Sequence, residues 1–143
     1  MRINRSMPED VLIPVLGYPS VSEAVAWLTR AFGFTVRWQI EDHRAQLGVG
    51  RTAAVAITTG AVPVTSDHVM IRIDDVDAHR ARAMEGGAVV SEATDYMYGE
   101  RQYAATDPSG RRWLFLSRSP TSRRKTGVHE AVNRIRPSAG TDV

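Results

Sequence analysis

Side chains that could bind a small molecule are concentrated in the second half of the chain. His68 offers an imidazole, Arg72 and Arg112 offer guanidinium groups, and Tyr96 and Tyr98 offer aromatic rings. Guanidinium groups pair with carboxylates and phosphates through two parallel hydrogen bonds, and tyrosine rings stack on planar molecules. These residue types therefore favour a ligand that has an apolar or aromatic body and an anionic group.

Nucleophilic catalysis finds little support in the sequence. The chain has no cysteine, no "GxSxG" elbow, no glycine-rich phosphate loop and no "HExxH" pattern, so thiolate, serine-hydrolase and common zinc-protease chemistry are disfavoured. His68 remains a candidate general base, because imidazole titrates near neutral pH. The alternative is a hydrogen-bonded structural histidine, since the sequence places no carboxylate to orient it.

The alternation of side chains along a strand predicts which residues share a face with His68. In the stretch "HVMIRI", Met70 and Arg72 fall on the face of His68, and the three apolar residues between them face a helix. The same rule, applied to the strands expected over residues 11–18 and 111–116, extends this face. We predict a ligand-binding set made of His68, Met70, Arg72, Tyr96, Tyr98, Arg112, Leu114 and Ile13.

Other readings of these residues stay open. Arg72 and Arg112 lie near strand ends, where they could reach solvent or pair with Asp74, Asp107 or Glu100 and bind nothing. The two tyrosines could belong to a packed loop rather than to a ligand site. Alternation also groups Trp38 with the more apolar side chains of "FTVRWQI", which predicts that Trp38 packs in the core.

Charge is distributed unevenly along the chain. Residues 1–117 hold 12 arginines, no lysine and 14 acidic residues, whereas residues 118–143 hold six basic and two acidic residues. The basic excess therefore belongs to a C-terminal tail rich in Ser, Thr, Pro and Gly, in which residues 128–135 have the spacing of a short helix. The tail lacks interleaved aromatic residues, so nucleic-acid binding is disfavoured.

The order of expected elements repeats after about 55 residues. A strand over 11–18, a helix from Ser20 or Ser22 to Gly33 and three strands over 34–59 are followed by a strand over 68–73, a helix over 75–88 and three more strands. The last three are "VVSEAT", "RQYAAT" and "RRWLFL", with "DYMYGE" as a loop. We expect two modules in which a helix covers one face of a mixed sheet and leaves the other face free.

The repeated modules, "AFGF" at the end of the first helix, "HVMIRIDDVDAHRARAMEGGA" and "YGERQYAATDPSGRRW" resemble the vicinal oxygen chelate superfamily. That superfamily contains glyoxalases, bleomycin resistance proteins and extradiol dioxygenases. The resemblance implies an α+β fold of two tandem βαβββ modules, whose curved mixed sheets form a cup-shaped cleft that a homodimer often completes. It also implies the organisation of the chain: an N-terminal extension (1–10), module one (11–66), module two (67–117) and the tail (118–143).

The enzymes of that superfamily hold a divalent metal with side chains from the first and last strands of both modules. By resemblance, the corresponding positions here are Ile13, His68, Leu114 and one in "TAAVAITT", and of these only His68 can bind a metal. A lone imidazole does not hold a hard divalent cation against water. We therefore expect no metal and no cofactor.

These expectations combine into one functional hypothesis and one alternative. The hypothesis is a metal-independent small-molecule-binding protein, cytoplasmic and homodimeric, that sequesters a drug or metabolite. With apolar stretches far below the roughly 20 residues of a membrane span, no membrane partner is expected. The alternative is a lyase, isomerase or dioxygenase-like enzyme with a non-standard metal site or with His68 as general base.

Overall fold

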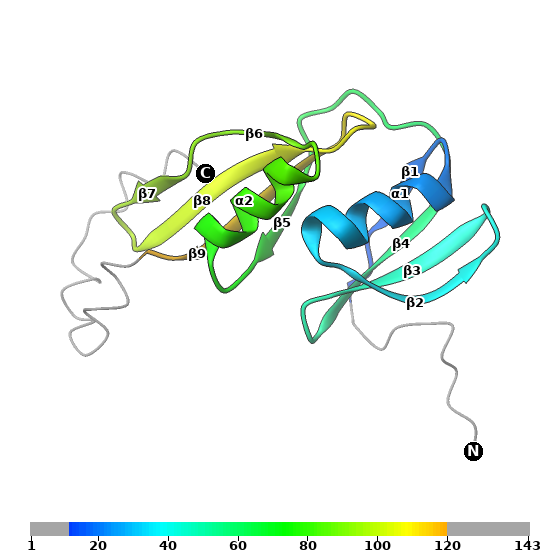
Figure 1. Cartoon of the computed structure of the whole chain (residues 1–143), viewed down its shortest axis with the longest axis horizontal. Coiled ribbons are helices and arrows are strands. Elements are labelled where there is room, and N and C mark those ends of the chain that lie inside the picture. Colours follow the sequence, from blue (N-terminus) through cyan, green and yellow to red (C-terminus); the bar gives the residue numbers. More distant parts are fainter. Residues whose placement is uncertain (1–11, 120–143) are drawn as a thin grey trace, which may run out of the picture.

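The computed structural model describes residues 12–119 (Figure 1). They form two modules in succession, as the repeat predicts. Module one contains β1 (Val15–Tyr18), α1 (Val21–Trp27), the π-helix η1 (Leu28–Phe32), β2 (Thr35–Ile40), β3 (Arg44–Val49) and β4 (Ala53–Thr59). Module two contains β5 (Val69–Arg72), α2 (Val76–Glu85), β6 (Val89–Val90), β7 (Thr94–Tyr96), β8 (Glu100–Thr106) and β9 (Arg112–Arg118).

Both sheets have the same plan. The first has the strand order β1-β4-β3-β2, and the second has the order β5-β9-β8-β6, with β7 also paired to β8. In each sheet the first strand of the module runs parallel to the last one, and the other pairs are antiparallel. The expected α+β fold of two βαβββ modules with mixed sheets is therefore confirmed.

The first helix begins and ends where its sequence predicts. Ser20 caps it by accepting a hydrogen bond from the backbone N–H of Glu23, and Gly33 ends it with a left-handed φ of 83°, a conformation that glycine adopts at little cost. The change to a π-helix at Leu28 was not predicted. At that change, the Thr29 hydroxyl lies 2.9 Å from the carbonyl oxygen of Val25.

One strand and one loop were predicted wrongly. "VVSEAT" is not a single strand, because β6 ends after two residues, and the predicted loop 95–100 includes most of β7. The interruption follows from Ser91, whose hydroxyl accepts a hydrogen bond from the backbone N–H of Ala104. A side chain thus takes the place of a backbone partner, and the strand pairing resumes only at Thr94.

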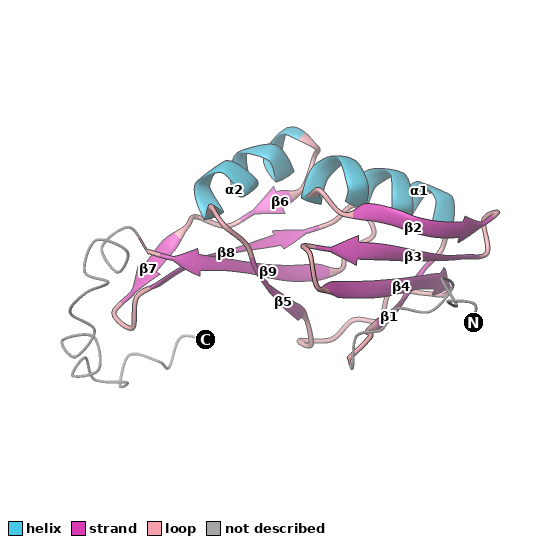
Figure 2. Cartoon of the chain, turned by 90° about the horizontal axis from the view of Figure 1, so that it is seen from below, coloured by secondary structure: helices cyan, strands magenta, loops and turns pink. Residues whose placement is uncertain are grey.

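The two modules share one hydrophobic core on the helix side of the sheets. Trp27 of α1 donates a hydrogen bond from its indole N–H to the carbonyl oxygen of Gly86, which follows α2. Phe32 brings its ring to within 5.5 Å of the Trp113 ring and 4.8 Å of the Phe115 ring, measured between centroids. Figure 2 shows both helices on the same side of the sheets. We call the side of each sheet that points away from the helices its open face.

None of the helices among residues 12–119 is long and apolar enough to cross a membrane. The predicted N-terminal extension and the helix predicted at residues 128–135 lie outside the described residues.

Candidate ligand-binding faces

The open face of the second sheet brings together side chains that the alternation rule grouped. Met70 is paired with Leu114, and Arg72 is paired with Leu116. Residues opposite one another on neighbouring strands project to the same face, and the residues between them, such as Phe115, lie in the core. This face therefore joins the buried apolar side chains of β9 to Met70 and Arg72, which remain exposed.

The guanidinium groups on this face differ in their surroundings. Arg72 donates a hydrogen bond to Glu100 Oε1 at 3.0 Å, one of the pairings left open by the sequence, although 61% of the Arg72 side chain is exposed. An exposed ion pair contributes little to stability and exchanges readily with water. Arg112 is exposed at the start of β9, where its backbone lies opposite Thr106 in the register with β8.

His68 and Ile13 lie just outside the strands that were expected to contain them. His68 is exposed, precedes β5, and places its Nδ1 atom 3.0 Å from the carbonyl oxygen of Ser66. Ile13 is half-buried and precedes β1, which starts only after Pro14. Neither His68 nor Ile13 is held in the sheet itself.

The tyrosines of the β7–β8 hairpin stack on one another. The rings of Tyr96 and Tyr98 are 5.5 Å apart between centroids and 5° from parallel. The Tyr98 hydroxyl also accepts a hydrogen bond from the Gln102 amide nitrogen at 3.4 Å. Both rings are half-buried, so they form an aromatic border beside the open face of the second sheet.

The prediction for Trp38 was wrong. The pairing of β2 with β3 shifts between Val36 and Trp38, which marks a β-bulge, and Trp38 is paired with Gln46. A bulge adds one residue to a strand and so reverses the faces of the residues that follow it. Since Ala45 and Leu47 lie in the core, Gln46 and Trp38 belong to the open face of the first sheet.

A row of four side chains consequently crosses the open face of the first sheet. Trp38 on β2 is paired with Gln46 on β3, Gln46 with Ala56 on β4, and Ala56 with Val15 on β1. Gln46 is only 2% exposed, yet its Oε1 atom has no hydrogen-bond partner within the described part of the chain. Sequence reasoning missed this site, although a glutamine amid the apolar residues of "RAQLGV" was an available signal.

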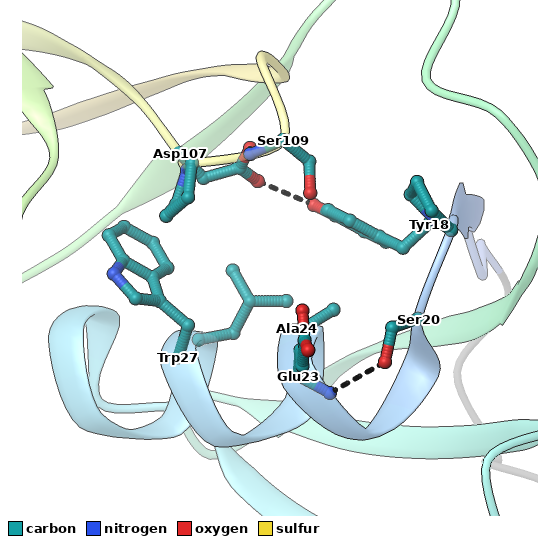
Figure 3. Close-up of a pocket in the computed structure, with 10 residues that line it drawn as sticks. Tyr18, Ser20, Glu23, Ala24, Trp27, Asp107 and Ser109 are labelled. Atoms are coloured by element: carbon teal, nitrogen blue, oxygen red, sulfur yellow. Dashed lines mark hydrogen bonds between the residues drawn. The ribbon is translucent and has the colours of Figure 1, made fainter.

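A cavity of about 240 Å³ lies elsewhere, between the start of α1 and the turn that joins β8 to β9 (Figure 3). On its wall, Tyr18 donates a hydrogen bond to Asp107 Oδ2, which also accepts one from the Trp113 indole. Burial raises the pKa of the Tyr18 phenol far above its ordinary value, so the hydroxyl remains a donor. Asp107 Oδ1 accepts from the backbone N–H groups of Ser109 and Arg111. Both carboxylate oxygens are therefore engaged, and Oδ2 joins the two modules.

Metal-ligating side chains are sparse in this fold. Residues 12–119 contain no group of three or more His, Cys, Asp and Glu side chains that could hold a metal ion. The residues on β1 and β4 that face away from the core are Val15, Gly17, Ala54, Ala56 and Thr58. β1 and β4 therefore offer no imidazole or carboxylate as a metal ligand.

The comparisons with known proteins agree with this geometry. Residues 12–115 match the Glyoxalase/Bleomycin resistance protein/Dioxygenase superfamily, and the chain belongs to that superfamily. It is similar to the uncharacterized proteins Mb0911c of Mycobacterium bovis and Rv0887c of Mycobacterium tuberculosis, with 34% identity over 85 residues, or 59% of this chain. The match covers 52% and 46% of those proteins, so the chain spans about half their length.

Solved structures show the same fold. TioX from Micromonospora sp. ML1 is 28% identical, with a TM-score of 0.64 over 74% of this chain and 94% of that one. TnmS3, an antibiotic binding protein from Streptomyces sp. CB03234, is 24% identical, with a TM-score of 0.65 over 78% and 97% of the two chains. The fosfomycin resistance protein FosX from Listeria monocytogenes is 15% identical, with a TM-score of 0.65 over 82% and 99%.

Proposed function

We propose that this protein binds and sequesters a small molecule without a metal ion, in the cytoplasm, as a homodimer. The ligand has an apolar or aromatic body and an anionic group. The observation that carries this proposal is the open face of the second sheet, where Leu114 and Leu116 lie beside the exposed guanidinium of Arg72. Apolar walls hold the body of such a ligand, and a guanidinium fixes its anionic end.

The residues that replace the expected metal ligands support the metal-free part of the proposal. Leu114 stands in the last strand where a carboxylate would serve, and the exposed His68 is held by a backbone carbonyl oxygen. Even if a site were formed by modules from two chains, the open-face residues that β1 and β4 would bring to it are apolar residues, a glycine and Thr58. Divalent cations need several oxygen or nitrogen donors, which this set does not provide.

The sheet edges support the homodimer. Within residues 12–119, β1 pairs only with β4, and β5 pairs only with β9, so each has an edge without a strand partner. Val15 on β1 is 58% exposed and Met70 on β5 is 46% exposed. Unpaired strand edges that carry apolar side chains favour association. In a homodimer, two copies would cover these edges and enclose the ligand.

The fold of the relatives is compatible with binding or resistance. TnmS3 is described as an antibiotic binding protein and FosX as a fosfomycin resistance protein, and both share this fold. Because the fold hosts different functions, the choice of binding over catalysis rests on the side chains described above.

Metal dependence is tested by thermal shift of purified protein with Ni²⁺, Zn²⁺, Mn²⁺ or Fe²⁺, together with measurement of bound metal. We expect no stoichiometric metal and no shift in wild type or in the control His68→Ala. Stoichiometric metal that is lost in His68→Ala would contradict the proposal and favour a lyase, isomerase or dioxygenase-like enzyme.

Binding is tested by calorimetric titration with planar aromatic carboxylates and with their uncharged amides. We expect the carboxylates to bind more tightly. We also expect light scattering to give the mass of a dimer, and Val15→Lys to shift that mass toward the monomer. Equal affinity for acids and amides would contradict the assigned role of the arginines, and a monomeric wild type would contradict the homodimer.

A further inference from the structure

The amide of Gln46 is a buried hydrogen-bonding group with an unpaired acceptor. The residue is 2% exposed, and its Oε1 atom has no partner within residues 12–119. A buried acceptor without a partner loses its bonds to water and gains nothing in return, so native structures rarely keep one without a reason. The position is therefore suited to a donor that comes from outside the chain.

Module two contains an internal comparison. Gln102 lies on β8, which occupies the same place in its sheet as β3, and it too is buried and projects to the open face. Its amide nitrogen donates to the Tyr98 hydroxyl at 3.4 Å. Gln102 has no buried amide atom that lacks a hydrogen-bond partner. The same type of residue at the equivalent strand thus keeps an internal partner in module two, whereas Gln46 Oε1 has none within residues 12–119.

The neighbours of Gln46 are one aromatic ring and several small side chains. Gln46 is paired with Trp38 on one side and with Ala56 on the other. Ala54 and Gly48, which also belong to this face, are small and buried. A Cβ atom at Gly48 would lie 2.8 Å from the Thr35 hydroxyl, so nothing larger fits there without a shift. The half-buried Trp38 therefore borders a floor of small residues.

We propose that Gln46 Oε1 accepts a hydrogen bond from a planar aromatic ligand that carries an O–H or N–H group and lies against Trp38. This inference rests on the proposed function, in which the homodimer brings this face opposite the open face of the second sheet of the other copy, and it narrows the ligand class to aromatic compounds with a donor on the ring system. Trp38 provides an extended π surface for stacking. Because Gln46 and Ala56 are each only 2% exposed, the ring reaches them only when the side chains that cover this face move aside. Gln46 supplies specificity, because a ligand without a donor leaves the buried oxygen unpaired.

Two probes of nearly equal shape test the inference. Both 6-hydroxy-2-naphthoate and 6-methoxy-2-naphthoate are planar aromatic anions, but only the first has a hydroxyl donor. In calorimetric titrations, we expect wild type to bind the hydroxy compound about tenfold more tightly, in line with one buried hydrogen bond. Gln46→Leu should remove that difference, whereas Gln39→Leu, at an exposed position of β2 that is paired with Ala45 on the opposite face of the sheet, should preserve it.

A ligand-free measurement adds an independent readout. Replacing an unpaired buried acceptor by an apolar side chain of similar size removes a destabilising group. Gln46→Leu should therefore raise the melting temperature of the free protein, and Gln102→Leu should lower it, because Tyr98 loses a partner. A lower melting temperature in Gln46→Leu would show that the oxygen is satisfied in the free protein and would overturn the inference.

The remaining outcomes separate this inference from the proposed function. If both naphthoates bind equally and Gln46→Leu changes neither affinity, the role of Gln46 is wrong while small-molecule binding stands. If neither compound binds wild type, the proposed ligand class fails, and the inference fails with it. If Gln46→Leu breaks the dimer without changing the preference between the probes, a second copy satisfies the amide and the inference is overturned.

Discussion

Tyr18 donates a hydrogen bond to the Asp107 carboxylate, with 2.7 Å between the two oxygens, although 89 positions separate the residues along the chain. The bond connects β1 of module one to the turn between β8 and β9 in module two. Asp107 is 4% exposed and also accepts from the Trp113 indole. A single buried carboxylate therefore joins the two modules on the helix side.

Tyr18→Phe should destabilise the protein, because the buried carboxylate loses one donor while the ring remains. Hydrogen bonds to charged groups contribute about 1.5–3 kcal/mol, and we expect a loss of that size in the free energy of unfolding. Urea denaturation measures it. The matched control is Tyr96→Phe, which removes a hydroxyl from a half-buried ring that stacks on Tyr98. Equal losses in the two variants would show that the bond to Asp107 adds nothing special.

His79 should make stability depend on pH. Its Nε2 atom lies 3.1 Å from the carbonyl oxygen of Phe32, which can only accept, so Nε2 carries the proton and Nδ1 accepts from the Tyr103 hydroxyl at 2.6 Å. Burial lowers the pKa of His79 below its ordinary value of 6.5. The stability of the neutral form is therefore complete above pH 6.5 and is lost as pH falls through the folded-state pKa, because the unfolded chain binds the proton more readily.

Unfolding titrations from pH 7.5 to pH 5 check this expectation. The free energy of unfolding should fall with a slope of at most about 1.4 kcal/mol per pH unit for one proton. His79→Gln should flatten that slope, and His43→Gln, at an exposed position, should keep it. An unchanged slope in His79→Gln would assign the pH dependence to other groups.

Gly86→Ala should disturb the contact between the helices. A Cβ atom there would lie 2.6 Å from the Cβ atom of Ala31, closer than two carbon atoms can approach without movement. Such overpacking typically costs about 1–3 kcal/mol, which thermal or urea unfolding can measure. Gly60→Ala is the control, since its Cβ would meet its nearest neighbour at 3.6 Å. Adding Ala31→Gly to Gly86→Ala should restore part of the loss, and a purely additive double mutant would argue against the clash.

Arg72 and Glu100 should affect an anionic ligand in opposite directions. Their exposed ion pair, at 3.0 Å, means that a ligand carboxylate competes with Glu100 for the same guanidinium. On the proposed function, Arg72→Gln should weaken binding of 6-hydroxy-2-naphthoate about five- to tenfold, and Glu100→Gln should strengthen it, both less so at high salt. Titration calorimetry at two salt concentrations measures these changes. Weaker binding in Glu100→Gln would mean that the ion pair positions Arg72 rather than occupying it.

Alternation predicted faces correctly where the strands are regular. On β5 and β9 the expected open-face residues Met70 and Leu114 are paired with one another, and Trp113 and Phe115, which alternate with them, lie in the core. On β2 the same rule failed at Trp38, because periodicity counts residues and cannot register the extra residue of a bulge. The strand break at Ser91 was missed for a related reason, since a side chain there bonds as a backbone group would.

The sequence pattern also could not identify the hydrogen-bond partners of individual polar groups. Glu100 appeared among three carboxylates that Arg72 could reach, and only the fold selected it. Gln46 lies between Trp38 and Ala56, which are ten or fewer positions away along the chain but are brought beside it only by the sheet register. Local order could be predicted from composition and spacing, whereas contacts between strands required the fold.

The common core of the two modules has a consequence for how the protein can change. Because α1, η1 and α2 bury their apolar side chains together, and Tyr18 and Asp107 tie the modules on the same side, the largest fully buried side chains lie on the helix side. Side chains on the open faces can then be exchanged at modest cost in folding free energy. The scaffold is therefore evolvable, because the helix side keeps the protein folded while a few substitutions on the open faces can change which ligand is bound.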